Sequence, residues 1–447
     1  GNGYWGGGIS CINSTVALKD LNINNNTAWG GAGVYGYNTN LDLENVTLQG
    51  NHSDNIGGGL LAGRSNEAES VNISFSNSLF ESNTADSAIG GAYLYGQDSD
   101  SLTVTISNSV FKSNSSPRYT GLIIYTGTFL VEDCVFELNQ ATNGFAAAGG
   151  FSTNTTGTVS RTRIVNNTAT NEVGGFLVSS ISDVNFDRCT FTNNVPGPGA
   201  ALAVENYSTI TVSNSIFWDN GNQPLAITGT ASTGAELSVS YSNVTGGADS
   251  VYTLEDNALL NWGDGNIDVD PHFIDTENDD YHLLAFSQCI NGGNPDSTDS
   301  DGSRADIGAL AYLNSYSGPI WYIAESGNDT TATGANGDPF RSIQAGINFS
   351  SDADSVTVAA GTYVENINFR GRNIKVVGAD REMTIIDGNQ NGSVVTINNN
   401  ESSTAMLKYF TIQNGYNSGT GYVEGLGHIG RGGGIFIRDA GPTLFGL

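Results

Sequence analysis

The sequence predicts an all-β fold, a parallel β-helix in which each repeat of the chain forms one coil. Three observations support this prediction. An Asn recurs at intervals of 25 to 32 residues, a large apolar residue precedes each Asn by three positions, and a pair of small residues such as Gly58-Gly59 lies between most copies. Repeats of this length, with short alternating apolar segments and no helical periodicity, are typical of β-solenoids.

The repeat occurs eight times within residues 1–260. The apolar residue and the Asn of the successive copies are Ile23 and Asn26, Leu48 and Asn51, Phe80 and Asn83, Phe111 and Asn114, Phe136 and Asn139, Ile164 and Asn167, Phe191 and Asn194, and Phe217 and Asn220. We expect the apolar residues to stack inside the solenoid, and the Asn side chains to form an amide ladder at a turn that Asn tolerates. The small pairs allow a tight corner. All three positions are therefore expected to be structural.

Each copy is expected to hold a short strand after the small pair and a longer, alternating strand before the Asn. In the second copy, alternation with one change of register directs four residues inward: Leu41, Leu43, Val46 and Leu48. Asp42 and Glu44 point outward in this arrangement, because successive side chains of a strand face opposite sides.

The combination of Phe-x-x-Asn with Gly-Gly-Ala steps resembles the repeats of polymorphic outer-membrane proteins and of pectin-lyase-like surface proteins. Residues 80–83 and 90–92 carry this pattern, and the resemblance covers most of residues 1–260. It implies a right-handed parallel β-helix (solenoid). The same fold class hosts polysaccharide lyases and glycoside hydrolases, so function has to be argued from individual residues.

Charge and hydropathy exclude two kinds of partner. The chain of 447 residues has 45 acidic and 16 basic side chains, a net charge of −29, so binding to a nucleic-acid backbone is not expected. No run approaches the ~20 apolar residues of a transmembrane segment. The composition is that of an extracellular or cell-surface protein. Both ends of the sequence lie inside repeats, which favours a portion of a longer tandem protein over a subunit that joins like subunits end to end.

The four cysteines are expected to be free thiols. Cys134 and Cys189 occupy the same place in their coils, but one coil separates them. At the ~4.8 Å strand spacing their Cα atoms lie ~9.6 Å apart, beyond the reach of a disulfide.

Residues 261–313 depart from the repeat and are predicted to form an acidic closing module. The order of the segments 268–273, 280–283, 287–293 and 299–308 resembles the closing modules of the choice-of-anchor type that follow β-helices in large bacterial surface proteins. We expect this module to cover the last coil, because an open coil edge invites association.

The candidate metal ligands of this module are Asp296, Asp299, Asp301 and Asp306. Acidic side chains at alternating positions around Gly302 resemble part of an oxygen-ligand loop for Ca²⁺. The spacing does not match an EF-hand, and the alternative is an Asp-rich turn held by Arg304. A structural calcium ion is thus one of two interpretations, and the sequence predicts no certain cofactor.

Residues 314–319 are predicted to form a linker, and residues 320–447 the start of a second β-helix. This segment resembles the N-terminal cap and first coils of pectate-lyase-like surface proteins, in which a Thr-Tyr-x-Glu-Asn-Ile sequence, here residues 362–367, follows the first strand. Strands are expected around residues 356–358, 374–377 and 394–397.

One short helix is expected at the start of this second unit. Asp338 is its predicted N-cap and Pro339 lies in its first turn. Its apolar face would consist of Phe340, Ile343 and Ile347. The resemblance implies that this helix plugs the end of the second solenoid.

The candidate surface for binding carbohydrate or a partner protein is a set of tyrosines that follow the small pairs: Tyr35, Tyr37, Tyr93 and Tyr95. The two members of each pair are two residues apart, so their side chains lie on the same side of a strand. Rings in a row suit a sugar or a protein partner, and exposed apolar patches are usually functional. The alternative is that half of these rings point into the core.

No catalytic cluster can be assembled from the repeats. Glycosidases need carboxylates at matching places in adjacent coils, and Asp187 and Asp219 occupy different places relative to their Asn. Arg161 and Arg163 form the best cationic pair, without acidic residues at the same register in neighbouring coils. The four histidines are scattered and do not form a metal set.

The sequence therefore favours a non-catalytic extracellular structural or adhesive β-helix protein, and an enzyme is the less favoured reading. Its expected partners are flanking repeats or like subunits, with cell-surface glycans as a further candidate. Two alternatives stay open: a polysaccharide lyase or glycoside hydrolase of pectin-lyase-like fold, and a carbohydrate-binding module.

Overall fold

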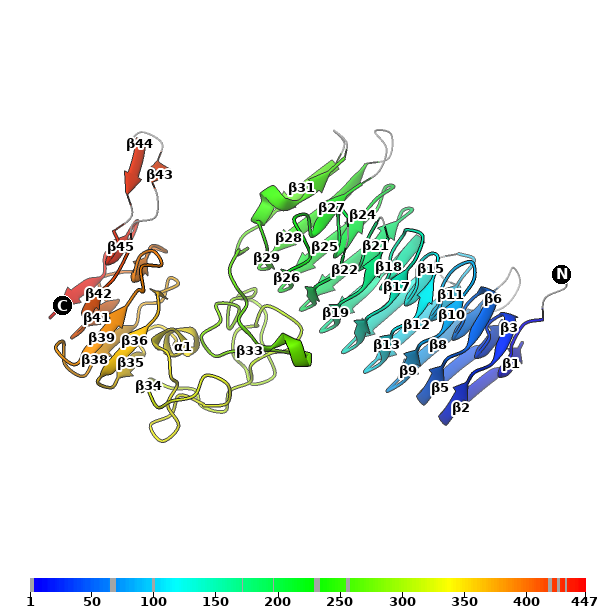
Figure 1. Ribbon diagram of the computed structural model, residues 1–447, viewed down its shortest axis with the longest axis horizontal. Helices are drawn as coiled ribbons and strands as arrows, with labels where there is room; N and C mark the ends of the chain where they lie inside the picture. The colour runs from blue at the N-terminus through cyan, green and yellow to red at the C-terminus, as the bar shows by residue number, and fades with distance from the viewer. Residues whose placement is uncertain are drawn as a thin grey trace. The chain divides into compact units, whose positions relative to one another are not determined.

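The structure is a computed structural model that describes residues 4–64, 70–98, 101–170, 172–195, 197–228, 234–254, 258–416, 420–423, 427–430 and 432–447. The described chain is nearly all β and forms a parallel β-helix, which confirms the predicted fold class (Figure 1). No helix among these residues is long and apolar enough to cross a membrane. The chain divides into two compact units, unit 1 with Gly1–Asp270, Gly292–Asp296 and Asp306–Leu310, and unit 2 with Pro271–Asn291, Ser297–Ala305 and Ala311–Leu447.

In unit 1 the strand after each small pair pairs in parallel with its equivalents in the coils before and after it. This first ladder consists of β1 (Ile9–Ile12), β4 (Val34–Tyr37), β7 (Leu60–Gly63), β11 (Ala92–Tyr95), β15 (Leu122–Glu132), β18 (Gly149–Ser160), β21 (Phe176–Ser179), β24 (Leu202–Val204), β27 (Leu225–Ile227) and β30 (Tyr252–Thr253).

The alternating strands form a second ladder, in which β15 and β18 also take part. Its other members are β2 (Thr15–Asn24), β5 (Asn40–Gln49), β8 (Val71–Ser76), β12 (Leu102–Ser107), β22 (Asp183–Asp187), β25 (Thr209–Ser213), β28 (Ala235–Ser240) and β31 (Ala258–Trp262). In Figure 1 these strands lie one behind the next from β2 in blue to β31 in green.

Two further ladders complete the coils. The third continues from the ends of β2 and β5 through β9 (Leu79–Glu81), β13 (Val110–Lys112), β16 (Val135–Glu137), β19 (Arg163–Val165), β23 (Thr190–Thr192), β26 (Ile216–Trp218) and β29 (Asn243–Val244). The fourth, after the ladder Asn, contains β3 (Thr27–Gly30), β6 (His52–Ile56), β10 (Thr84–Ala85), β14 (Ser115–Ser116), β17 (Gln140–Ala141) and β20 (Thr168–Ala169). A short 3-10 helix, η1 (Gly247–Ser250), follows β29.

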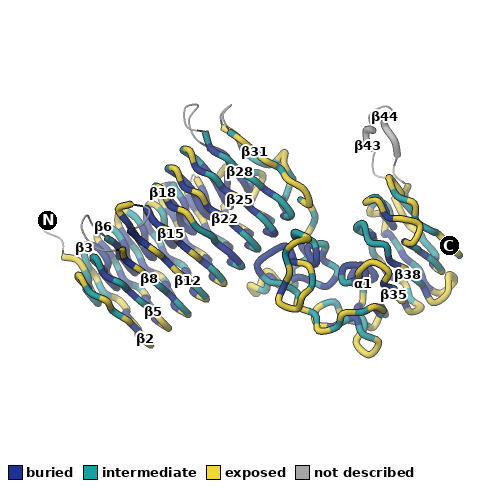
Figure 2. The backbone as a smooth tube through the Cα atoms, turned by 180° about the vertical axis from the view of Figure 1, so that it is seen from behind, coloured by how far each residue is buried: buried dark blue, intermediate teal, exposed yellow. Residues whose placement is uncertain are grey.

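Alternation within β5 places the side chains as the sequence predicts. Its four apolar residues before and after the turn are buried, whereas Glu44 and Asn45 are both exposed. The change of register occurs at Asn45, whose φ of 56° lies in the left-handed region that Asn tolerates better than most residues. The same alternation of buried and outward positions runs through the neighbouring coils (Figure 2).

The repeat phenylalanines stack inside unit 1. The rings of Phe80 and Phe111 have centroids 4.7 Å apart and planes 11° apart, and Phe111 and Phe136 are 4.7 Å apart and 2° from parallel. Phe191 and Phe217 form an equivalent pair at 4.6 Å. All five rings are fully buried. Stacked pairs of this kind add about 1 kcal/mol each to the gain from burial.

The repeat asparagines form a continuous buried ladder. Asn114 Nδ2 donates to Phe80 O (2.9 Å) and to Asn139 Oδ1 (3.0 Å), and Asn114 Oδ1 accepts from the backbone N (3.0 Å) and Nδ2 (3.1 Å) of Asn83. The same amide-to-amide bond links the successive ladder residues Asn26, Asn51, Asn83, Asn114, Asn139, Asn167, Asn194 and Asn220. A Cβ on Gly91 would lie 2.1 Å from Gly121 O, so the corner beside this ladder requires glycine.

Two short segments of the predicted closing module belong to unit 1. Asn294 N donates to Asn214 Oδ1 (2.6 Å), Gly308 N donates to Asn214 O (2.7 Å), and Ala309 N donates to Thr190 Oγ1 (2.9 Å). These contacts are with coils that precede the last one.

Unit 2 has its own strands and core. A parallel sheet contains β34 (Ile320–Ile323), β35 (Ser355–Val358), β38 (Lys375–Gly378), β41 (Met406–Lys408) and β46 (Thr443–Phe445). Shorter parallel sheets contain β36 (Gly361–Val364), β39 (Thr384–Asp387) and β42 (Thr411–Gln413), and β37 (Ile367–Asn368), β40 (Val395–Ile397) and β45 (Ile435–Ile437). The antiparallel pairs are β32 (Phe273–Asp275) with β33 (Asp280–Leu283), which flank the 3-10 helix η2 (Thr276–Asn278), and β43 (Thr420–Val423) with β44 (Gly427–Gly430).

The one α-helix among the described residues, α1 (Ile343–Phe349), begins later than the sequence predicts. Asp338 is not its N-cap, because its Oδ2 accepts from Thr333 N (2.8 Å) within the preceding turn. Phe340 is extended and bridges to Ile323, which keeps this segment out of the helix. Ser342 is the N-cap, and its Oγ accepts from the backbone N of Ala345.

A partly buried carboxylate at the start of α1 makes the stability of unit 2 depend on pH. Glu365 Oε1 accepts from Ile343 N (2.8 Å) and Oε2 accepts from Gln344 N (3.0 Å). Burial raises the pKa of Glu365 to about 7, although these two hydrogen bonds lower it. The folded state therefore holds a proton that the unfolded chain releases near its ordinary pKa of 4.5. Stability should fall by up to about 3 kcal/mol as the pH rises through this window.

Denaturant unfolding of Glu365→Gln across the same window checks this expectation. The variant should lose most of the pH dependence, because its amide does not titrate, whereas Glu382→Gln, which removes an exposed carboxylate, should keep the wild-type slope. Equal slopes in wild type and Glu365→Gln would contradict the expected role of this carboxyl group.

Candidate functional site

One outer face of unit 1 carries the tyrosines that the sequence points to. The register of the first ladder aligns Tyr35 with Leu61, Tyr93 and Ile123 in one outward row. A second row, two residues further along each strand, contains Tyr37, Gly63, Tyr95, Tyr125 and Ser152. We call Tyr35, Tyr37, Tyr93, Tyr95 and Tyr125 the tyrosine face.

The rings of the tyrosine face lie outside the core. In β11 the alternate residues Ala92 and Leu94 are fully buried, whereas Tyr93 and Tyr95 are half-buried and lie against one another with centroids 5.5 Å apart. A Cβ on Gly63 would lie 2.6 Å from Tyr95 Cδ1, so the ring covers the glycine of the preceding coil. At the other end of the face, Trp5 stacks on Tyr35 with centroids 5.3 Å apart.

The phenols of Tyr35, Tyr93 and Tyr95 have a raised pKa and stay protonated at neutral pH. Burial, and then the proximity of Tyr125, raise the pKa of Tyr93 to about 12. Burial also raises the pKa of Tyr35, with a further contribution from Tyr37. Each ring therefore offers an uncharged apolar surface and a hydroxyl group that can both donate and accept a hydrogen bond. Tyr125, at 40% exposure, is the most open ring of the set.

The same side of unit 1 carries an acidic cluster that the sequence analysis missed, formed by Tyr119, Glu172 and Glu205. Glu205 follows β24 and continues the second outward row, since its backbone N donates to Val178 O (3.0 Å). Glu172 Oε2 accepts from Phe145 N (3.0 Å). Tyr119 packs on the ring of Phe145 with centroids 5.1 Å apart.

The three groups of the acidic cluster influence one another electrostatically. Burial raises the pKa of Glu205, and the negative charge of Glu172 raises it further. Burial also raises the pKa of Tyr119, with Glu205 and then Glu172 adding to the effect. A carboxylic acid of raised pKa beside a second carboxylate is the pair of groups that glycosidic cleavage uses.

A signal for the acidic cluster exists in the sequence. Tyr119 and Glu172 each lie five residues after a ladder asparagine, Asn114 and Asn167, and so they occupy the same place in their coils. Asp187 and Asp219 lie before their ladder Asn, so a comparison of their positions does not include this turn.

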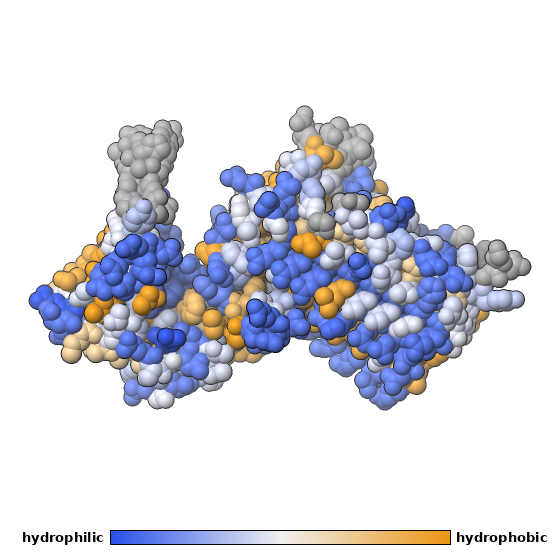
Figure 3. Space-filling model, viewed as in Figure 1, coloured by the Kyte–Doolittle hydropathy of each residue, from blue (hydrophilic) through white to orange (hydrophobic). Residues whose placement is uncertain are grey.

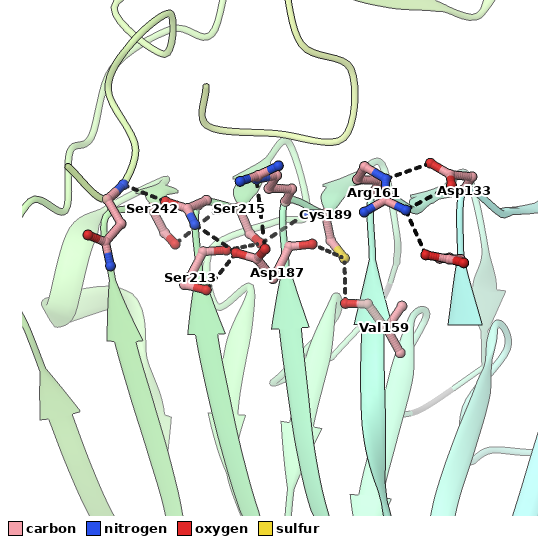
Figure 4. A network of polar contacts seen from close by, with 12 residues as sticks. Asp133, Val159, Arg161, Asp187, Cys189, Ser213, Ser215 and Ser242 are labelled. Atoms are coloured by element: carbon pink, nitrogen blue, oxygen red, sulfur yellow. Dashed lines mark hydrogen bonds and ion pairs between the residues drawn. The ribbon is translucent and has the colours of Figure 1, made fainter. Parts of the chain in front are cut away.

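Arg161 donates hydrogen bonds to carboxylates of the preceding coil (Figure 4). The expectation that neighbouring coils have no acidic residues at this register is therefore wrong. Arg161 Nε donates to Asp133 Oδ1 (2.8 Å), and Nη2 donates to Asp133 Oδ2 (2.9 Å) and Glu132 Oε2 (2.7 Å). Because β15 pairs Glu132 with Ser160, Asp133 is in register with Arg161. The bonds to Asp133 raise the pKa of Arg161, so this guanidinium is a structural cation and not a free base.

The cysteines are free and buried, which confirms the prediction of buried thiols. Cys134 Sγ donates to Glu132 O (3.1 Å), and Cys189 Sγ donates to Val159 O (3.4 Å; Figure 4). Burial raises the pKa of Cys134 to about 12 and also raises that of Cys189. Neither thiol is a nucleophile at neutral pH.

The predicted calcium ligands are divided between the two units. Asp296 and Asp306 belong to unit 1, and Asp299 and Asp301 to unit 2. Partial burial raises the pKa of Asp301, but hydrogen bonds from Ser303 and Asn314 outweigh this effect and leave the pKa below its ordinary value. The calcium site stays a prediction.

Hydrophilic residues cover most of the face of the molecule shown in Figure 3, with hydrophobic residues in separate small groups. The face in this view therefore carries separate small apolar groups and not one large apolar patch.

A match to a protein-family model supports the fold. Residues 69–244 match the family model described as "Right handed beta helix region". A solved structure of a point mutant of the PL6 family alginate lyase AlyGC is similar over 97% of this chain and 73% of that chain, at 10% identity and a TM-score of 0.21. The structure of AlyGC itself is similar over 98% and 72%, at 10% identity and a TM-score of 0.19. Both similarities are too weak to guide an argument about activity, and no curated protein matches the chain. The family match and the parallel, in-register coils together show a right-handed parallel β-helix.

Proposed function

We propose that this chain is a non-catalytic, extracellular β-helix protein whose tyrosine face binds a polysaccharide. The alignment of Tyr95 and Tyr125 in one row, with Tyr93 beside them in the next, carries the proposal. Rings in adjacent coils repeat at the ~4.8 Å strand spacing. A flat aromatic surface with hydroxyl groups at its edge packs against the C–H faces of sugar rings and bonds their hydroxyls.

Charge indicates which polysaccharides fit. The net charge of −29 repels an anionic polymer. The phenols of the tyrosine face are uncharged, so the favoured ligand is a neutral glycan. A uronate polymer would require cations to bridge the two negative partners.

The stacked coils suit a structural role in the same protein. Ladders of buried Phe and Asn make each coil depend on its neighbours, as in other solenoids. We propose flanking repeats or like subunits as the partners of the coil ends, at a cell surface. The tyrosine face would then be displayed along the side of a rod of such coils.

Affinity electrophoresis in gels that contain neutral or uronate polysaccharides tests the binding proposal. The wild-type chain should be retarded by at least one neutral glycan. Tyr93→Ala and Tyr95→Ala should each weaken retention by about tenfold, because each removes a stacking surface. Tyr416→Ala is the matched control, since Tyr416 is an exposed tyrosine outside this face. Equal retention of all variants, or none across a broad panel, would contradict the proposal.

A second candidate function is cleavage of a glycosidic bond at the acidic cluster. The observation that favours it is the raised pKa of Glu205 beside Glu172. Glu205, as the general acid, would donate a proton to the leaving oxygen, while the Glu172 carboxylate would take a proton from the attacking water or attack the anomeric carbon itself.

New reducing ends released from a polysaccharide panel would test this second function. Activity, if present, should be lost in both Glu205→Gln and Glu172→Gln. Retention of a glycan without any released product would favour binding alone. Product formation that survives both substitutions would remove the acidic cluster from consideration.

A further inference from the structure

A histidine and two aspartates meet on the outer surface of the fourth ladder. β6 and β10 pair in parallel with His52 opposite Thr84 and Ser53 opposite Ala85. Ser53 and Ala85 point into the core and are buried. The next residues, Asp54 and Asp86, therefore point outward beside each other, on the same side as His52 and Thr84.

The ligand atoms of these three side chains converge. His52 Nε2 lies 3.6 Å from Asp54 Oδ1 and 3.8 Å from Asp86 Oδ1. The three atoms all lie within 4.8 Å of one another, a separation that one shared ion can span. Within the described ranges of the chain, this is the one group of three or more His, Cys, Asp or Glu side chains arranged in this way.

A partner of the imidazole fixes its orientation. His52 Nδ1 lies 2.9 Å from Thr84 Oγ1, the residue directly opposite in the neighbouring coil. This contact leaves Nε2 as the nitrogen directed at the two carboxylates. Metal-binding histidines are commonly held through their second ring nitrogen in the same manner.

The coil of His52 differs here from the other coils of the ladder. The residues at the His52 position of the other coils are neutral: Thr27, Thr84, Ser115, Gln140 and Thr168. Two aspartates side by side on adjacent strands repel each other, which destabilises the pairing unless a positive charge lies between them. A cation held by His52 and both carboxylates would remove this repulsion.

We propose that His52, Asp54 and Asp86 bind a divalent first-row transition ion, of which Zn²⁺ is the probe of choice. One imidazole nitrogen and two carboxylate oxygens form a three-ligand set to which water adds the fourth position. The nitrogen ligand discriminates against Ca²⁺ and Mg²⁺, which prefer all-oxygen sites. The side chains are 40%, 56% and 64% exposed, so the ion has direct access from solvent.

Calorimetric titration of the full chain with ZnCl₂, in the presence of excess CaCl₂ and MgCl₂, tests the assignment. We expect one equivalent to bind the wild-type chain. His52→Gln and Asp86→Asn should each abolish this binding. Thr84→Val, which keeps the shape of the residue but removes the partner of Nδ1, should weaken it by about 10-fold or more.

The matched control is His282→Gln. His282 also contacts one carboxylate, since its Nδ1 lies 2.7 Å from Asp280 Oδ1, and its replacement should leave the titration unchanged. Circular dichroism and the melting temperature verify that each variant is folded. The assignment is overturned if the wild-type chain shows no saturable binding, if Ca²⁺ or Mg²⁺ competes on equal terms, or if binding survives His52→Gln. The buried thiols are present in every variant, so zinc held by cysteine would still bind to His52→Gln.

Discussion

Asn114→Leu is expected to destabilise unit 1 by about 3 kcal/mol, because the buried N–H of Asn83 loses its acceptor and the amide ladder is interrupted. Asn114 Oδ1 accepts from Asn83 N, and Asn114 Nδ2 donates to Phe80 O. Leucine of similar volume fills the space but leaves the buried N–H of Asn83 without this acceptor, at a cost of about 1–3 kcal/mol, and removes the bond to Phe80 O. The broken amide ladder between Asn83 and Asn139 adds to the loss.

Thermal or denaturant unfolding of unit 1 measures this effect, and Asn185→Thr provides the control. Asn185 is exposed on β22, and its partners in the two neighbouring coils are Thr158 and Thr211. A threonine there matches its neighbours and should change stability by less than about 0.5 kcal/mol. Similar losses in both variants would show that the asparagine ladder has no special contribution.

Phe111→Ala is expected to destabilise unit 1 by about 3–5 kcal/mol, the cost of a large cavity in a packed core. The ring lies between those of Phe80 and Phe136, both with centroids 4.7 Å away, so its removal interrupts the stack on both sides. Unfolding measured by the same method should show a smaller loss for Phe111→Leu, which retains most of the buried volume.

The difference between the two substitutions at Phe111 separates stacking from volume. If Phe111→Leu is as destabilising as Phe111→Ala, the ring geometry itself dominates. If Phe111→Ala costs less than about 1 kcal/mol, the neighbouring coils have closed the cavity and the stack is not a main source of stability.

The coil architecture could be predicted from the sequence because two periodicities fix it. The alternation of β5 assigns inward and outward residues, and the recurring Asn marks the same turn in every coil. Parallel pairing without a register slip then follows, since a shift by one residue would expose Leu41 and Leu43. The tyrosine positions follow from the same register.

The start of α1 could not be predicted in this way. Asp338 and Pro339 have the composition of a helix start, but the bridge between Phe340 and Ile323 holds the chain extended until Ser342. Tertiary pairing therefore overrides a favourable local signal, as it often does for short helices.

Side-chain contacts between neighbouring coils also could not be predicted from the sequence. Arg161 meets Asp133, and His52 meets Asp86, across coil intervals of 28 and 32 residues. The intervals vary along the chain because the turns differ in length, so equal spacing in the sequence does not identify neighbours. Counting positions from each ladder Asn does identify them: Asp54 and Asp86 both lie three residues after theirs.

Oxidative footprinting of the tyrosine side chains tests most directly whether the tyrosine face binds a polysaccharide. It is carried out with and without the glycan that retards the protein most. We expect the glycan to protect Tyr35, Tyr93, Tyr95 and Tyr125 from hydroxyl radicals and to leave the exposed rings of Tyr409 and Tyr416 as reactive as before. Protection that falls elsewhere, with these four rings unchanged in the glycan-bound protein, would contradict a polysaccharide-binding role for the tyrosine face.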